Sequence, residues 1–201
     1  MPATFQKIDT NMKRIVLTGG PGAGKTFISR CLVAESAERF ALVPEAATQV
    51  YSALGTRWDL LDVARRRDVQ QMIYRFQIEQ ENTIAAANPG KILLLDRGTI
   101  DGSAYWPEGP GEYWRDLDST LARELKRYDA VIWMQTAAAI RIYDGSDSNP
   151  CRFEDAAAAV SSGEVLKNLW HDHADFRTVD AYPLLDDKLR AVRQVVAECL
   201  D

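Results

Sequence analysis

The chain has 201 residues, of which 46% are hydrophobic and 26% charged, and these proportions are ordinary for a folded globular protein with a substantial core. Acidic residues outnumber basic ones by 29 to 24 and no segment clusters Lys and Arg, so no nucleic acid partner is expected. No apolar run approaches the roughly 20 residues of a transmembrane helix, and the N-terminus lacks the apolar core of a secretory signal. Cys31, Cys151 and Cys199 show no metal-ligand spacing. We therefore expect one domain over residues 1–201, in the cytoplasm and with reduced thiols; the sequence gives no indication of its oligomeric state.

The first predicted strand, residues 13–18, follows a leader over residues 1–12 and runs into a glycine-rich segment. Gly19–Thr26 fits the pattern G-x-x-x-x-G-K-[ST], and a helix is predicted from Lys25 to Arg39. A strand, this loop and a helix together form a phosphate-binding loop, in which backbone N–H groups and the helix N-terminus hold phosphate. Lys25 is expected to reach the β- and γ-phosphates, and the Thr26 hydroxyl to bind Mg²⁺. The residues expected to contact a nucleoside triphosphate are Gly20, Gly22, Ala23, Gly24, Lys25, Thr26 and Phe27.

The second predicted strand, Phe40–Val43, ends at Pro44 and Glu45. Ligands of open α/β sheets bind at the carboxyl ends of the strands, so Glu45 is a candidate site residue. A short helix over Ala46–Leu54 and a loop that carries Trp58 follow.

The clearest helical periodicity runs from Arg65 to Ala87. The apolar stripe of this helix, interrupted by one long polar side chain, Gln80, consists of Val69, Met72, Ile73, Phe76, Gln80, Thr83, Ile84 and Ala87. Four arginines lie largely off the stripe, namely Arg65, Arg66, Arg67 and Arg75. Their arrangement favours a solvated helix face, with a role in an anionic substrate pocket as the alternative.

The third predicted strand, Lys91–Leu95, is a continuous apolar run and brings Asp96, Arg97 and Gly98 to its carboxyl end. An Asp at this place commonly supports the Mg²⁺ of a phosphate-loop enzyme, and the alternative role for Asp96 is a helix cap. For Asp101 the two open interpretations are a cap of the next turn and a group that faces the site.

The next segment is a loop over residues 105–111 whose aromatic side chains either stack on a ligand ring or pack beneath the loop. A helix over residues 114–128 and a strand over residues 129–134 follow. Thr136 is a suitable N-cap for a helix over residues 137–143.

Residues 144–152 are polar and rich in turn formers, with almost nothing to bury. In nucleotide kinases a mobile lid lies at this place, and its arginines close over the transferred phosphoryl group. A lid near residues 141–155 is therefore predicted, with Arg152 a better candidate than Arg141. The alternative is an ordinary connection between two helices.

The last part of the chain is predicted to form helices over residues 154–160 and 164–173, a strand over 176–180 and a helix over 185–200. His171 and His173 point in different directions on a helix, so a metal role is not expected. Strands that alternate with helices indicate an α/β fold. We expect a phosphate-loop NTPase with three α/β/α layers around a mainly parallel, five-stranded sheet.

Four segments together resemble one phosphate-loop family: Gly19–Thr26, V-P-E-A-A-T at 43–48, D-R-G-T-I-D at 96–101 and N-P-C-R-F-E at 149–154. This is the AAA-like ATPase group that includes the ribosylnicotinamide kinase domain of bacterial NAD regulators and the TRPL translocation defect proteins. The resemblance covers nearly the whole chain. The placement of the same elements is also similar to that in deoxynucleoside and thymidylate kinases.

The resemblance implies roles for particular residues. Glu45 is implied as general base or hydroxyl anchor, Asp96 as a support for Mg²⁺, and Arg97 as a contact of the substrate or the phosphoryl group. Gln77, which follows Phe76 as on the base-reading helix of deoxynucleoside kinases, is a candidate substrate contact together with Asp101. The chain departs from the kinase pattern in having no lid with several arginines. It also lacks an N-K-x-D motif, which favours ATP over GTP, although the eukaryotic relatives are regarded as GTP binders.

We therefore expect Mg²⁺-dependent transfer of the γ-phosphoryl group of ATP to a hydroxyl of a small, nucleoside-like acceptor. The residues expected to be catalytic are Lys25, Glu45, Asp96, Arg97 and Arg152. The alternative is a switch that binds ATP or GTP, hydrolyses it slowly and acts on a protein or lipid partner.

Overall fold

The computed structural model describes residues 12–142 and 155–200. The predicted leader before residue 12 and most of the predicted lid, with Cys151 and Arg152, lie outside the described residues. No helix in the described ranges is long and apolar enough to span a membrane.

A parallel sheet of five strands organises the described chain. The strands are β1 (Arg14–Thr18), β2 (Phe40–Val43), β3 (Ile92–Asp96), β4 (Ala130–Met134) and β5 (Phe176–Val179). Their order is β2-β3-β1-β4-β5, and every neighbouring pair is parallel, as the alternation of strands and helices predicts. The phosphate loop follows β1, Glu45 follows β2 and Asp96 is the last residue of β3, so all three lie at one edge of the sheet.

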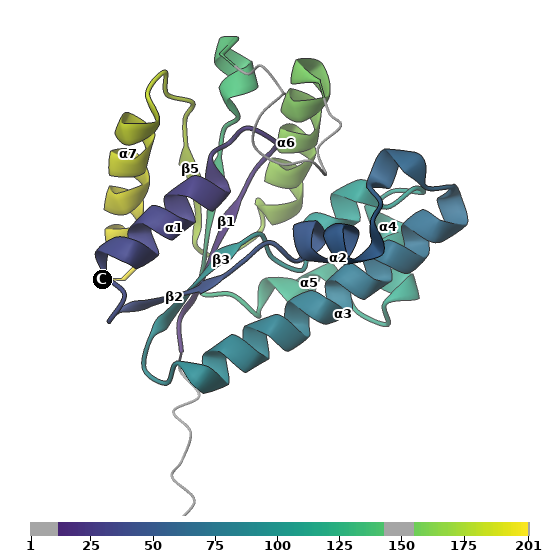
Figure 1. Ribbon diagram of the computed structural model, residues 1–201, viewed down its shortest axis with the longest axis horizontal. Helices are drawn as coiled ribbons and strands as arrows, with labels where there is room; N and C mark the ends of the chain where they lie inside the picture. Colours follow the sequence, from purple (N-terminus) through teal and green to yellow (C-terminus); the bar gives the residue numbers. More distant parts are fainter. Residues whose placement is uncertain (1–11, 143–154, 201) are drawn as a thin grey trace, which may run out of the picture.

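Helices cover both faces of the sheet and extend beyond it (Figure 1). The longer helices are α1 (Lys25–Glu35), α2 (Ala46–Leu54), α3 (Val63–Ala87), α6 (Ala156–Trp170) and α7 (Leu185–Glu198). The shorter ones are α4 (Pro110–Asp116), α5 (Leu121–Leu125) and the 3₁₀ turns η1 (Trp58–Leu60), η2 (Asp101–Tyr105) and η3 (Ala137–Ile140).

Two apolar clusters separate the layers. One packs Ile15, Leu17 and Ile132 of the sheet against α1 and α7. The other packs Val16 and Leu95 from the opposite face against α6, α5 and the last turns of α3. Neighbouring residues of a strand point to opposite faces, which is why continuous apolar strands serve both layers and the expected three-layer sandwich forms.

The buried face of α3 differs from the predicted apolar stripe. Val69 and Ile73 are buried as expected, but Met72 is 45% exposed and the long polar side chains of Gln70 and Gln77 are buried. Figure 1 shows the reason, because α3 runs past the sheet and its N-terminal half lies beside α2 and α4. There the burial of polar side chains depends on hydrogen bonds and on a pocket rather than on packing against the sheet.

Other predicted boundaries also change. Helix α1 ends at Glu35 rather than at Arg39, and the predicted helix over 114–128 is two short helices, the second capped by Thr120. The predicted helix after Thr136 is the 3₁₀ turn η3. The predicted break at 161–163 is wrong, because α6 continues through Gly163, which faces Gly20 of the phosphate loop.

Candidate active site

The phosphate loop packs against its surroundings so closely that side chains are excluded. A Cβ atom at Gly19 would lie 2.2 Å from the carbonyl oxygen of Met134, and a Cβ at Gly20 would lie 2.3 Å from that of Ala159. Gly24 has a φ of 82° and forms the N-cap of α1. The N-terminus of this helix, with its positive dipole end, adjoins the loop, as phosphate binding requires.

The turn after β4 holds the loop in place. The Thr136 hydroxyl donates to the Pro21 carbonyl, and the Ala137 amide donates to the Gly22 carbonyl at 3.2 Å. Thr136 also accepts from the Ala138 amide, which confirms its predicted capping role. Two carbonyl groups of the loop are thus bound from this side.

Lys25 is only 4% exposed and its ammonium group lies over the loop. The Nζ atom donates to the carbonyl oxygens of Gly19 at 2.8 Å and Gly20 at 3.0 Å. A phosphate group bound to the loop would offer stronger, charge-assisted acceptors to the same ammonium group.

Thr26 and Asp96 meet beneath the loop. The Thr26 hydroxyl donates to Oδ2 of Asp96 at 2.5 Å, and Oδ1 of Asp96 is buried without a hydrogen-bond partner. Burial raises the pKa of Asp96, and the neighbouring carboxylate of Glu45 raises it further. A hydroxyl and a carboxylate oxygen that lacks a partner are the hard oxygen ligands that fit Mg²⁺. The described residues form no group of three or more acidic, His or Cys side chains able to hold a metal, so phosphate oxygens and water would complete the coordination.

Glu45, Arg97 and Asp101 form a charged chain beside the loop. Arg97 Nε donates to Glu45 Oε1 at 2.6 Å, and an Nη atom of Arg97 donates to Asp101 Oδ1 at 3.1 Å. Burial raises the pKa of Glu45, but the charges of Arg97 and Lys25 outweigh this effect and lower the pKa well below its ordinary value. Glu45 is therefore an ionised carboxylate at neutral pH.

Asp101 accepts hydrogen bonds on both carboxylate oxygens. Besides Arg97, its donors are the Thr18 hydroxyl at 2.7 Å, the Trp170 indole at 3.0 Å and the Gly98 amide at 3.3 Å. These contacts orient Asp101 towards Arg97. Sequence patterns gave no indication of Thr18 or Trp170, because both lie within segments that read as ordinary strand and helix.

Gln77 connects α3 with the same group of residues. Its amide donates to Glu81 Oε1 at 3.0 Å and to the Arg97 carbonyl at 3.3 Å. Arg97 is thus held through its guanidinium group and through its backbone.

A pocket begins at Glu45, Arg97 and Pro21 and continues along α3, and the empty space in and around it, open solvent included, is about 790 Å³. The lining comprises Pro21, Glu45, Ala46, Ala47, Thr48, Tyr51, Trp58, Gln70, Ile73, Tyr74, Gln77, Arg97, Gly98, Thr99, Asp101, Gly102, Tyr105 and Tyr113. Tyr51, Gln70 and Tyr113 were not among the predicted site residues, since Tyr51 lies on a predicted helix, Gln70 lies off the predicted stripe and Tyr113 directly precedes the predicted helix over 114–128.

The aromatic side chains of the loop over residues 105–111 differ in their surroundings. Tyr105 lines the pocket, whereas Trp106 is buried beneath the loop with its ring 5.3 Å from that of Tyr113. None of the four arginines of α3 lines the pocket. Arg66 stacks on Trp58 at 3.7 Å and Arg67 pairs with Glu108, so these two support the pocket wall from outside.

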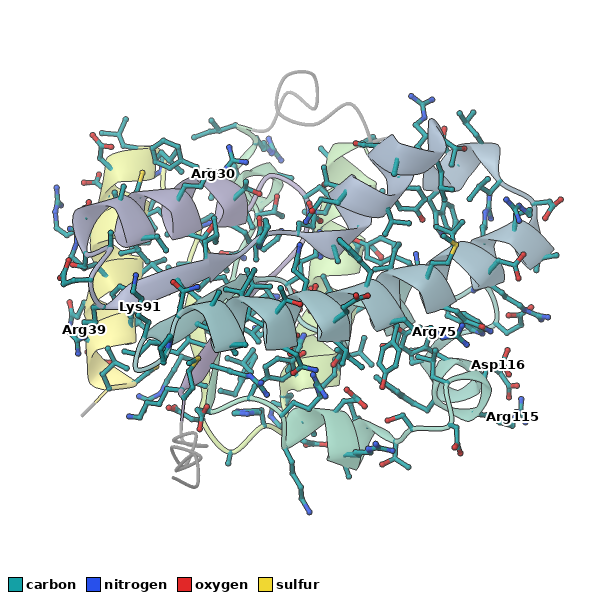
Figure 2. All side chains as sticks on the ribbon, turned by 60° about the horizontal axis from the view of Figure 1, so that its bottom comes forward. Arg30, Arg39, Arg75, Lys91, Arg115 and Asp116 are labelled. Atoms are coloured by element: carbon teal, nitrogen blue, oxygen red, sulfur yellow. The ribbon has the colours of Figure 1, made fainter. Side chains whose placement is uncertain are left out.

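The remaining predicted residues lie apart from this cluster or outside the described ranges. Phe27 is 45% exposed on the first turn of α1, and Arg141 is an exposed residue that ends η3. His173 contacts the Tyr128 carbonyl and accepts from the Asp175 amide, which agrees with a structural role. Figure 2 shows Arg30 and Arg39 among the side chains at the periphery of the molecule.

Comparisons with known proteins agree with this architecture. The solved structure of NadR protein in complex with NAD and AMP-PNP has a TM-score of 0.65 and 17% identity, and the match covers 93% of this chain and 49% of the NadR chain. This chain thus spans about half the length of NadR, and the likeness shows a common fold. No curated protein matches the chain. A family model described as an AAA domain matches residues 14–180, most of the sequence. The chain therefore belongs to this AAA domain family.

Proposed function

We propose that this protein is a kinase that transfers the γ-phosphoryl group of ATP to a hydroxyl group of a small, nucleoside-like metabolite. The observation that carries the proposal is the placement of Glu45 and Arg97, which pair with each other and line a pocket that also includes Pro21 of the phosphate loop. A domain that only hydrolyses a nucleotide as a switch has no need of such a pocket.

The reaction assigns a role to each residue. The acceptor oxygen forms a bond to the γ-phosphorus, the bond to the β–γ bridging oxygen breaks, and ADP leaves with the electron pair of that bond. Lys25 and the loop amides hold the phosphates, and Arg97 neutralises charge on the transferred group. When bound at Thr26 and Asp96, Mg²⁺ supplies further charge neutralisation. Arg152, which lies outside the described residues, is proposed as a further catalytic contact on the basis of the sequence alone.

Glu45 is better suited to orienting the acceptor hydroxyl than to removing its proton. Its lowered pKa makes it a weak base, but each carboxylate oxygen has a free lone pair beside the bonds from Arg97 and Thr48. The hydroxyl can donate to Glu45 while its oxygen faces the γ-phosphorus, and its proton passes to an oxygen of the transferred phosphoryl group. Positioning of this kind is the main protein contribution to phosphoryl transfer.

The nucleotide is proposed to be ATP with Mg²⁺, with GTP as the alternative. The NadR complex, which shares the fold, holds the ATP analogue AMP-PNP and NAD. The cytoplasm suits this activity, since Cys31 and Cys199 are free thiols in the described part of the chain.

A screen of nucleosides with ATP and Mg²⁺ tests the proposal. We expect ADP to form rapidly in the presence of one acceptor class, Lys25→Ala to abolish turnover, and Glu45→Gln to lower turnover about a hundredfold while ATP binding is retained. Glu38→Gln, at an exposed carboxylate on the turn before β2, is the matched control. Slow ADP formation that no acceptor changes would instead support the nucleotide-dependent switch.

A further inference from the structure

One face of α3 defines the length of the acceptor pocket. Gln70, Ile73, Tyr74 and Gln77 all line it, and the seven positions from Gln70 to Gln77 correspond to about 10 Å of helix. Gln77 lies at the phosphoryl-transfer end, because it donates to the Arg97 carbonyl. Gln70 therefore lies at the far end, at the distance that a sugar and an attached ring would span.

Gln70 carries an unused hydrogen-bond acceptor at that far end. Its side chain is 97% buried, its Nε2 donates to the Tyr51 hydroxyl at 3.3 Å, and its Oε1 is buried without a partner. This oxygen is a buried polar atom without a partner, and the residue that carries it lines the far end of the pocket. Buried carbonyl oxygens are almost always hydrogen-bonded, so an unpaired one beside a pocket indicates a missing donor.

The surroundings of this oxygen suit a flat ring. Tyr51 and Tyr113 lie next to it, and a Cβ atom at Gly102 would come within 2.4 Å of the Tyr113 hydroxyl and 3.2 Å of Gln70 Oε1. The lack of a side chain at Gly102 keeps this part of the pocket open. Trp58, fixed by its indole bond to the Tyr105 carbonyl, adds a further aromatic wall. Aromatic walls with one polar group are typical of sites that bind a heterocycle and read one of its edges.

We propose that Gln70 determines acceptor specificity by accepting a hydrogen bond from an N–H group of a heterocyclic base. The acceptor is then a nucleoside whose base carries a ring N–H or an exocyclic amino group. This inference rests on the proposed function, which places the reacting hydroxyl of the acceptor at Glu45 and Arg97 and therefore its base at Gln70. It replaces Gln77, the polar residue that the sequence suggested for base reading, with the residue two turns earlier on the same helix.

Binding measurements in the presence of AMP-PNP and Mg²⁺ test this inference independently of turnover. Titration calorimetry would compare uridine with its N3-methyl derivative, inosine with its N1-methyl derivative, and adenosine with its N6-dimethyl derivative. We expect at least one N–H nucleoside to bind tenfold or more tightly than its methylated partner. Gln70→Met should reduce that ratio to near one, whereas Gln70→Glu, which keeps an acceptor oxygen, should preserve it.

The control is Gln71→Leu, which changes the neighbouring glutamine outside the pocket lining and should leave the ratio unchanged. The inference is overturned if no nucleoside binds, if methylation has no effect, or if Gln70→Met retains the full preference. A nucleoside that binds with Gln70-dependent preference but is not phosphorylated would support the inference and contradict the kinase proposal. Phosphorylation without that preference would do the reverse.

Discussion

At the scale of single residues, Arg97 shows how the site is held together. Its φ of 77° is unusual for a residue with a side chain, and such a conformation costs about 1 kcal/mol or more. Contacts with Glu45, Asp101 and Gln77 maintain it. In this conformation Arg97 lines the pocket and its guanidinium group reaches both Glu45 and Asp101.

Arg97→Lys is expected to lower turnover by about two decades while binding of ATP to the phosphate loop is retained. A lysine keeps the charge, but its N–H groups share one nitrogen atom, whereas Arg97 reaches Glu45 and Asp101 with two different nitrogen atoms of a planar group. Turnover and the ATP dissociation constant measure the two effects. Arg75→Lys, at the surface of α3 in Figure 2, is the control, and equal turnover in both variants would contradict the role of Arg97.

Lys188 gives a prediction for stability against pH. The side chain is 3% exposed in the first turn of α7, its ammonium group donates to the Gln135 carbonyl, and burial lowers its pKa from 10.5 to about 8. Between about pH 8 and 10.5 the unfolded chain holds a proton that the folded chain has lost. The free energy of unfolding should therefore rise with pH in this window, by about 1–3 kcal/mol from this residue.

Urea denaturation of the parent protein and of Lys188→Met at several pH values tests this prediction. The free energy of unfolding of the variant should not rise in this way, so the stability difference between parent and variant should grow with pH. The exposed Lys126, changed to Met, should behave as the parent protein does. A difference that stays constant from pH 8 to 10 would show that the pKa of Lys188 is not lowered.

At the scale of elements, the contact of α6 with the phosphate loop depends on Gly20 and Gly163. The two residues face each other, and the Trp133 indole donates to the Gly163 carbonyl, so β4 joins the contact. The two glycines differ in the space around them. A Cβ at Gly163 would meet the nearest atom of Gly20 at an ordinary 3.5 Å, whereas a Cβ at Gly20 would lie 2.3 Å from the Ala159 carbonyl.

Gly163→Ala is therefore expected to stabilise the fold by about 0.5–1 kcal/mol, since alanine is favoured over glycine inside a helix. Gly20→Ala should lower both stability and nucleotide affinity, because the phosphate loop must move to accept the methyl group. Urea midpoints and the affinity for AMP-PNP would measure these opposite effects. Destabilisation by Gly163→Ala would mean that the contact has no room for the added methyl group.

At the scale of the whole molecule, nucleotide binding should be coupled to folding. The loop, Thr26 and Asp96 come from different elements, so a ligand that joins them binds the folded state alone. At a concentration a hundred times its dissociation constant, such a ligand adds about 2.7 kcal/mol to the free energy of unfolding. For a chain of this length the corresponding rise in Tm is roughly 5–10 °C.

AMP-PNP with Mg²⁺ should produce this rise, and removal of the metal with a chelator should reduce it. Lys25→Ala should lose most of it, while Lys126→Ala should not. Differential scanning calorimetry provides the measurement. A shift that the chelator leaves unchanged would argue against a metal contact at Thr26 and Asp96.

The sequence by itself determined the phosphate loop, the five strands and their alternation with helices. Each is a local signal, since the loop is one contiguous motif and each strand one short apolar run. Asp96 and Glu45 could be selected for a related reason, because a polar residue directly after a buried strand reaches the binding edge of any parallel sheet. Some helix ends and the break predicted within α6 were wrong, because tertiary contacts such as that of Gly163 override local preference.

Only the tertiary structure decided how the site is assembled. Arg97 meets Glu45 across 52 positions, and Asp101 meets Trp170 across 69 and Thr18 across 83. The buried face of α3 was hidden for the same reason. Periodicity records where apolar side chains are buried, but the burial of a polar side chain such as Gln70 depends on a partner or a pocket supplied by distant parts of the chain.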